Sequence, residues 1–193
     1  VEATIMIEVK DAFYLAKHLG ITTADFYDKY TKMFMLEDTG FPVFALKAVG
    51  NDKSCVFLKG KRCSVQTVKP RTCRLYPFWV FPDDNGDFVY NYSTERRHHP
   101  KGSLIRVKDW MRDFLSDEDK EYLLEDARSI KEIAAPYNIL YKNLKDPNSI
   151  LTKVLMYRYF MYDTSEPFMP QFRRNNRVLK DELERIITKF TSA

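Results

Sequence analysis

The residues of this sequence that could do chemistry are its three cysteines, which are close together. Cys55, Cys63 and Cys73 fall within 19 of the 193 residues. Thiolates bind zinc or iron when turns bring them together at metal–sulfur distances of about 2.3 Å. A hairpin turn at residues 59–62 would bring Cys55 and Cys63 close, and Pro70 would bend the chain ahead of Cys73. The alternative is that the thiols are small buried hydrophobic groups, because C-x7-C-x9-C is not a standard zinc-finger spacing.

Basic residues lie beside these cysteines in the sequence. A positive charge near a thiol lowers its pKa and favours the thiolate, which is the form that binds metals. We therefore expect lowered thiol pKa values here. The basic neighbours are Lys59, Lys61, Arg62, Arg71 and Arg74.

The elements that must position the cysteines begin with a helical hairpin. Apolar residues at helical spacing predict a helix over residues 9–19 that ends at Gly20. A second helix is predicted over residues 23–36, with Thr22 or Thr23 as its N-cap.

A small β-rich unit with all three cysteines in its first half follows this hairpin. A run rich in β-branched and aromatic residues predicts a strand at 42–49. Two short strands are predicted on either side of the turn at 59–62. A further hairpin is closed by Asn85-Gly86, a strong turn signal. The predicted strands of these two hairpins are 54–58, 63–68, 76–81 and 87–92.

The last third of the chain is predicted to be helical. Ser116, with Asp119 three residues later, predicts a helix start, and the pattern continues up to Pro136. Further helices are predicted over residues 148–162 and, capped by Asn176, near the C-terminus, with residues 165–170 as a linker. The narrow apolar stripe of the final helix predicts that this helix packs on the rest of the protein or on a partner.

The predicted fold is therefore α+β: an N-terminal helical hairpin, a small antiparallel β unit holding a Cys-rich metal knot, and a helical C-terminal segment. We expect residues 1–112 to form a cysteine-cluster metal-binding domain. Residues 113–193 would be a helical extension that packs on it or on a partner.

Composition narrows the classes of protein. The chain is 45% hydrophobic and 30% charged, which excludes a disordered chain. The net charge of +4 is too small to argue for nucleic-acid binding by itself, so no nucleic acid is expected. No apolar run approaches the roughly 20 residues of a membrane span. Three cysteines exclude a disulfide scaffold and indicate a reducing compartment, the cytoplasm. Aromatic residues make up 15% of the chain, which suggests a large aromatic core or a surface for a protein partner.

One longer pattern resembles a known family. The segments C-x-F-L from Cys55, C-S-V from Cys63 and K-P-x-x-C-R-x-Y-P-F from Lys69 are similar to those of the YkgJ-type cysteine-cluster family of zinc- or iron-chelating domains. The stretch from Ile5 to Gly20 also resembles the first helix of that family. The resemblance covers about residues 5–105.

The sequence departs from the family pattern in two places. The family's C-x2-C-C group would precede Val1, so the printed sequence does not include it. His99 stands where the family often has a further cysteine. Histidine is an acceptable zinc ligand. His98 and His99 cannot both point inward from an extended backbone, because adjacent side chains alternate, and we expect His99 to be the ligand. The alternative is an exposed pair in a loop.

The resemblance therefore implies a metal site made of Cys55, Cys63, Cys73 and His99. This ligand set suits zinc, whereas an iron–sulfur cluster would prefer four cysteines, so iron or such a cluster is the alternative cofactor. The expected function is a metal-binding module with a structural or assembly role, which meets a protein partner through aromatic surface or C-terminal helices. The alternatives are a metal- or redox-dependent enzyme, or an accessory subunit of a protein-modifying enzyme.

Two other features have ordinary explanations. Trp79 and neighbouring basic residues resemble a single-strand nucleic-acid surface, but a β core with surface charge explains them. The run from Arg173 to Arg177 is typical of a solvated helix start, although it could also meet an acidic partner.

Overall fold

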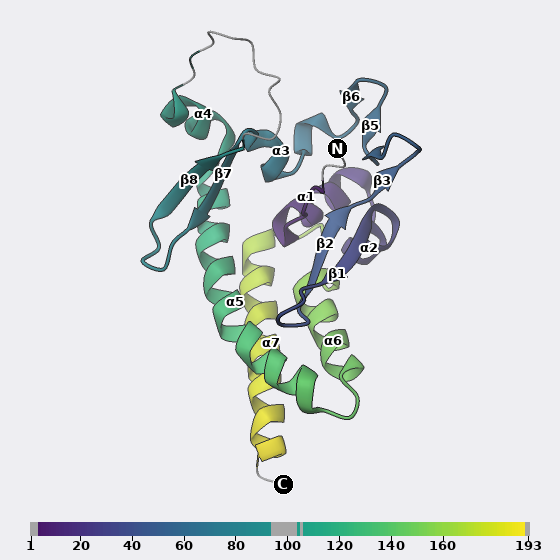
Figure 1. The fold of residues 1–193 in the computed structure, drawn as a ribbon, viewed down its shortest axis with the longest axis vertical. Helices are drawn as coiled ribbons and strands as arrows, with labels where there is room; N and C mark the ends of the chain where they lie inside the picture. Colours follow the sequence, from purple (N-terminus) through teal and green to yellow (C-terminus); the bar gives the residue numbers. More distant parts are fainter. Residues whose placement is uncertain (1–3, 94–103, 105, 192–193) are drawn as a thin grey trace.

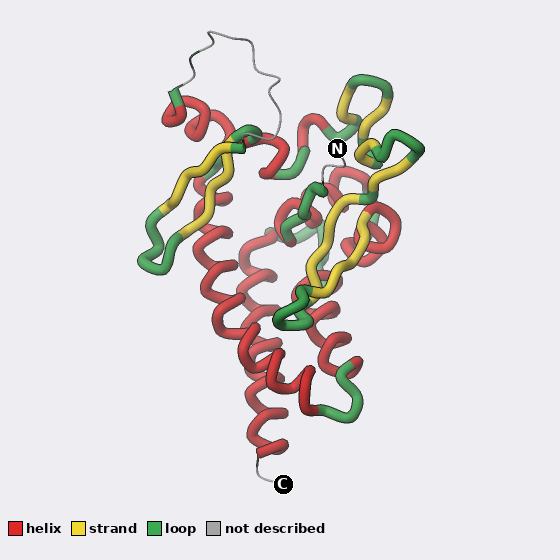
Figure 2. The backbone as a smooth tube through the Cα atoms, viewed as in Figure 1, coloured by secondary structure: helices red, strands yellow, loops and turns green. Residues whose placement is uncertain are grey.

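The computed structural model describes residues 4–93, 104 and 106–191. Within these residues, seven α-helices and four two-stranded antiparallel sheets form an α+β fold with a helical C-terminal region (Figure 1). The two longer hairpins, at residues 31–46 and 78–92, lie apart from one another (Figure 2). The overall class agrees with the sequence prediction.

The N-terminal hairpin forms as predicted, although its second helix is shorter. Helix α1 (Val9–Leu19) ends at Gly20, whose φ of 66° is the left-handed conformation that glycine tolerates. Helix α2 (Thr23–Tyr30) begins at Thr22, whose side chain accepts a hydrogen bond from the Asp25 amide. The prediction that this helix continues to residue 36 is wrong.

Tertiary pairing converts the missing part of that helix into a strand. Strand β1 (Thr31–Met35) pairs antiparallel with β2 (Pro42–Leu46), so residues 31–35 gain backbone partners on β2. The Ile7 amide donates to the Phe44 carbonyl on the other edge of β2. Because β2 is mostly buried, pairing along it outweighs the weak helical preference of residues 31–35.

The cysteine-bearing region consists of very short elements. Strands β3 (Ala48–Val49) and β4 (Ser54–Cys55) form one ladder, and β5 (Leu58–Lys59) and β6 (Arg62–Cys63) form another. The predicted turn at 59–62 is confirmed. The predicted strand over residues 63–68 is wrong beyond Cys63, because the chain turns into the 3-10 helix η1 (Gln66–Val68) and then into α3 (Arg71–Leu75).

The aromatic hairpin agrees closely with its prediction. Strands β7 (Phe78–Pro82) and β8 (Phe88–Tyr92) pair antiparallel. The Asp83 carboxylate accepts hydrogen bonds from the amides of Asn85 and Asp87 and so closes the turn. Helix α4 (Val107–Phe114) was not predicted.

Helix α5 (Asp117–Asn143) starts where the sequence predicts it and runs past the predicted end. Ser116 and Asp119 form a capping box. The helix continues through Pro136, so the predicted end there is wrong. Tyr137 and Leu140 beyond the proline are fully buried, and this burial supports the second half of the helix.

The C-terminal helices also differ in their limits. Helix α6 (Asn148–Val154) continues into the π-helical segment η2 (Leu155–Phe160), as the predicted helix over 148–162 implied. Helix α7 (Phe168–Thr191) begins before Asn176, so the predicted cap at Asn176 is wrong. The predicted linker over 165–170 is confirmed for residues 165–167 and wrong for 168–170, which are helical. The buried rings of Phe168 and Phe172 explain the earlier start, since they anchor the first turns to the core.

One hydrophobic core runs through the N-terminal and C-terminal parts. The ring centroids of Phe13 and Phe168 are 5.2 Å apart, and those of Phe44 and Tyr159 are 4.8 Å apart. The C-terminal helices therefore pack on the N-terminal hairpin. The division into domains 1–112 and 113–193 stays a prediction. None of the described helices is both long and apolar enough to cross a membrane.

Candidate functional site

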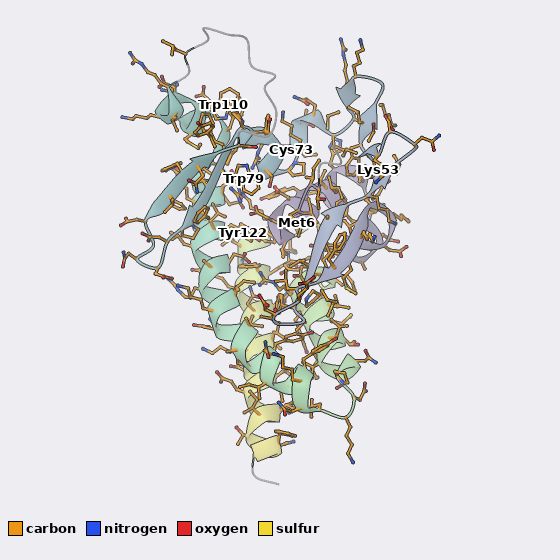
Figure 3. The ribbon with its side chains drawn as sticks, viewed as in Figure 1. Met6, Lys53, Cys73, Trp79, Trp110 and Tyr122 are labelled. Carbon is orange, nitrogen blue, oxygen red and sulfur yellow. The ribbon has the colours of Figure 1, made fainter. Side chains whose placement is uncertain are left out.

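The three cysteines lie on three different short elements. Cys55 ends β4, Cys63 ends β6 opposite Leu58, and Cys73 is in the middle of α3. All three are half-buried free thiols. Cys73 (labelled in Figure 3) lies on α3, which a hydrogen bond from the Arg71 amide to Asp11 joins to α1.

The structure brings the thiols within electrostatic range of one another without forming a ready ligand set. The charges of Cys55 and Cys63 both raise the pKa of Cys73. Among residues 4–93, 104 and 106–191, however, no three His, Cys, Asp or Glu side chains are grouped so that they could hold a metal ion. The fourth predicted ligand, His99, lies outside the described residues, as does His98.

The expected lowering of thiol pKa values is wrong for two of the cysteines. Burial raises the pKa of Cys73 to about 12, and the charges of Cys55, Asp11 and Cys63 add to the effect. Burial also raises the pKa of Cys55. The two nearest arginines, Arg71 and Arg74, are engaged by carboxylates and do not outweigh burial.

Both sides of Cys73 are held by hydrogen bonds to distant elements. The backbone amide of Arg71 donates to Asp11 over 2.9 Å, and its guanidinium donates to Glu8 and to the Val80 carbonyl. The indole of Trp110 donates to the Leu75 carbonyl over 3.0 Å. A five-residue helix is not stable by itself, so these contacts fix the position of Cys73.

Asp119 ties this helix to the start of α5 and to α1. Its carboxylate accepts from Arg74 at 3.0 Å and from the Lys10 ammonium at 2.8 Å, while it also caps α5. Burial opposes ionisation of Asp119, but the Lys10 hydrogen bond and the Arg74 charge keep its pKa below the ordinary value. Lys10 and Asp119 are both buried, so each needs the other.

A polar pocket of 290 Å³ opens beside this network. Asp11 is buried in its wall, and burial together with the nearby Glu8 charge raises the Asp11 pKa to about 7. The Tyr14 hydroxyl donates to Glu118 over 2.9 Å. A buried carboxyl group that titrates near neutral pH in a pocket is the kind of group that catalytic sites use. The lining residues are Lys10, Asp11, Tyr14, Thr67, Val68, Arg74, Ser116 and Glu118.

The sequence carried little signal for this pocket. Lys10 and Asp119 are 109 residues apart, and Asp11 lies 60 residues before Arg71. The one local signal is that Lys10, Asp11 and Tyr14 fall at neighbouring positions of the first predicted helix. Comparison with known proteins adds nothing to this picture, since no family model, no curated protein and no solved structure matches the chain.

Proposed function

We propose that this protein is a metal-binding module in which Cys55, Cys63 and Cys73 contribute three thiolates to a structural zinc site. The observation that carries the proposal is that three half-buried free thiols on β4, β6 and α3 lie near enough for the charges of Cys55 and Cys63 to raise the pKa of Cys73. Sulfur donors of this kind select zinc or iron over magnesium or calcium. Zinc would supply cross-linking of β4, β6 and α3, which have few backbone bonds of their own.

The donor set fits zinc in kind but is incomplete among the described residues. Structural zinc has four ligands, and three thiols leave one position for another donor, for which His99 is the candidate that the sequence supplies. The half-buried thiols must also move closer to share an ion. The raised pKa values of Cys55 and Cys73 mean that metal binding must displace protons, so zinc affinity should increase with pH.

The test is metal content and melting temperature of the whole chain with Cys63 replaced by Ser. We expect about one zinc per chain in the native protein, and loss of that zinc with a lower Tm in Cys63→Ser. Ser64→Ala is the matched control, since it alters the next residue without removing a thiol. Equal metal content and Tm in the native and Cys63→Ser proteins would contradict the proposal. Iron with a visible absorption band would favour the alternative cofactor, an iron–sulfur cluster.

The pocket beside α3 supports a second candidate, a metal- or redox-dependent enzyme or its accessory subunit. It places Asp11, with a pKa of about 7, next to the helix that carries Cys73. Cobalt substitution separates the two candidates. A closed structural site keeps its cobalt spectrum when azide is added, whereas a site with an open coordination position changes its spectrum.

A protein partner is part of this proposal. The outward face of the β7–β8 hairpin presents Trp79 and Phe81, which are 54% and 46% exposed and follow one another on the same face. Aromatic side chains of this kind are enriched at interfaces. The end of α7, with the exposed Phe190, is the second candidate surface. A free-thiol site also suits a reducing compartment, and we propose the cytoplasm.

A further inference from the structure

The outer edge of strand β8 presents backbone groups that the hairpin does not use. In the described part of the chain β8 pairs only with β7, and Figure 1 shows β8 on the side of the hairpin that faces away from α1. The Asp83 amide donates to the Asp87 carbonyl, so hydrogen-bonded pairs of this ladder fall at every second residue from there. The amides and carbonyls of Phe88, Tyr90 and Tyr92 therefore point away from β7. Among residues 4–93, 104 and 106–191 they form no backbone hydrogen bond.

The other edges of the longer hairpins are covered or protected by charge. On the far side of β7, the Val80 carbonyl accepts from the Arg71 guanidinium over 3.1 Å. The outer edge of β2 is bonded by the Ile7 amide. On β1 the Thr31 amide donates back into α2, and Lys32 places a charge in the strand. Charged residues, lysine above all, protect edge strands from pairing with other chains. Strand β8, with the sequence Phe-Val-Tyr-Asn-Tyr, carries no charge and is therefore the unprotected edge.

The side chains of β8 suit pairing with an identical strand. Phe88, Tyr90 and Tyr92 share one face of the hairpin, and the two tyrosines are 47% and 67% exposed. If two such strands run antiparallel about a twofold axis at Tyr90, each Tyr92 lies opposite Phe88 of the second copy. The two Tyr90 side chains then lie opposite one another. This register makes about six new backbone hydrogen bonds. It also forms aromatic cross-strand pairs, which stabilise sheets.

A pocket beside Tyr90 has room for side chains of the second strand. Its volume is 610 Å³, and it lies between β8, α4 and the start of α5. Met111 and Leu115 in its wall are buried, so the core holds this part of the wall in place. A strand added to β8 directs alternate side chains to the same face as Tyr90, and thus toward the pocket. The lining cations Arg112 and Lys120 are paired with neighbouring aspartates.

We propose that two copies of this chain associate through antiparallel pairing of their β8 strands, which joins the two hairpins into one four-stranded sheet with Tyr90 at its twofold axis. A twofold pair is the commonest symmetry of protein oligomers, and here it covers both open edges at once. The pairing uses none of the cysteines, so it goes beyond the proposed metal site and does not depend on it.

Analytical ultracentrifugation of the metal-loaded full chain between about 5 and 500 μM tests the association. We expect a monomer–dimer equilibrium with a Kd below about 100 μM. In the dimer, the amides of Phe88, Tyr90 and Tyr92 should exchange their hydrogens more slowly than in the monomer. A chain that stays monomeric over this range would overturn the proposal. A dimer in which these three amides exchange as fast as in the monomer would overturn it as well.

A charge at residue 90 tests the register. Tyr90→Glu and Tyr90→Lys each place like charges opposite one another at the axis, so each should raise the Kd by roughly tenfold or more. An equimolar mixture of the two should dimerise about as tightly as the native protein, because opposite charges then meet. Met33→Lys is the matched control. Met33 is 41% exposed and its backbone points outward from the open edge of β1, so this variant should dimerise as the native protein does.

A mixture of the two charged variants that stays monomeric while the native protein dimerises would overturn the proposal. An equal loss in Met33→Lys would also overturn it, since association would then not be specific to β8. Melting curves establish that each variant is folded. Metal content measured on the same samples separates a failure of this pairing from a failure of the proposed metal site.

Discussion

Burial sets the protonation of the groups around α3. The raised pKa values of Cys73 and Asp11 have the same first cause, which is the removal of their charged forms from water. A zinc ion would reverse this for the thiols, since a bound cation stabilises thiolates. Asp11, which is not a predicted ligand, offers the cleaner test of this local environment.

We expect Asp11→Asn to change how stability depends on pH. The Asp11 pKa is about 7 in the folded chain and 3.8 ordinarily, so between these pH values the folded chain holds the extra proton. Its contribution to stability is therefore present at low pH and is lost as pH rises toward 7. The variant keeps an acceptor for the Arg71 amide and has no such loss. Its free energy of unfolding, relative to the native protein, should rise by up to about 1.4 kcal/mol per pH unit in this window.

Urea unfolding at several pH values between 4 and 8 measures this difference. Asp83→Asn is a suitable control, because that carboxylate lies in an exposed turn and accepts the same kind of backbone hydrogen bonds. A difference between Asp11→Asn and the native protein that stays constant across the window would show that Asp11 ionises normally.

At this scale the sequence indicated the three cysteines as candidate ligands, which stays a prediction, and it gave no sign of the groups that hold them in position. Cysteine clustering is visible within 19 residues, so Cys55, Cys63 and Cys73 could be named in advance. The contacts of Asp119 with Lys10 and Arg74 join residues far apart in the chain, and no local pattern encodes them. The thiol pKa prediction failed for the same reason, because burial depends on tertiary packing.

At the level of elements, the Asp119 carboxylate at the N-terminus of α5 joins this helix to α1 and α3 through Lys10 and Arg74. Asp119→Ala should remove one half of the α5 capping box, the hydrogen bond that its carboxylate accepts from the Ser116 amide, and deprive the buried Lys10 ammonium of its nearer carboxylate. Removal of one partner of a buried ion pair costs about 3–5 kcal/mol, so we expect a destabilisation of that size. Asp117→Ala is the control on the same helix turn, since that carboxylate is fully exposed and should change stability by less than about 0.5 kcal/mol.

Chemical denaturation of the two variants gives the comparison. If Asp119→Ala and Asp117→Ala are equally stable, the contacts of Asp119 with Lys10 and Arg74 do not hold these helices together. Circular dichroism of Asp119→Ala under native conditions establishes that the folded state is still populated.

The turn between β1 and β2 gives a second prediction at this scale. Gly40 has φ +65°, and a Cβ atom there would lie 2.7 Å from the ring of Tyr141 on α5. Gly60 has φ +61° with nothing within 4 Å. Both Gly→Ala changes strain the backbone, at roughly 1 kcal/mol each. Gly40→Ala must in addition displace the Tyr141 ring, so we expect it to be the more destabilising by at least about 1 kcal/mol.

Urea midpoints of the two alanine variants measure that excess. The same midpoint for both would mean that the second half of α5 does not press against this turn. The Tyr137 hydroxyl also donates to the Gly40 carbonyl over 2.8 Å, so Tyr137→Phe is a third variant that should weaken the same contact.

Element limits were harder to predict than element types. Helix α5 passes Pro136 because Tyr137 and Leu140 are buried beyond it, and α7 starts early because Phe168 and Phe172 enter the core. In both helices the deciding energy is burial against residues elsewhere in the chain, whereas the sequence signals used were proline and a capping residue. The start of α5 was predicted correctly because its capping box is local.

For the whole molecule, the question is whether residues 1–112 form a domain that is independent of the C-terminal helices. The described contacts favour one unit. Tyr27 and Phe44 of the N-terminal part pack on Tyr159, and the Tyr159 hydroxyl donates to the Pro42 carbonyl over 2.7 Å. The buried ring of Tyr122 on α5 (labelled in Figure 3) lies 5.8 Å from the ring of Phe168, which in turn packs on Phe13 of α1.

We therefore expect a single cooperative unfolding transition of the metal-free chain. Both tryptophans, Trp79 and Trp110, lie in β7 and α4 and report on the region before residue 113, whereas far-ultraviolet circular dichroism is dominated by the long helices α5 and α7. A shared core requires the two signals to change at the same urea concentration, because neither part can keep its apolar surface buried without the other. Two separated midpoints would instead show that residues 1–112 fold as a domain of their own. The C-terminal helices would then be an extension whose removal leaves the cysteine region folded.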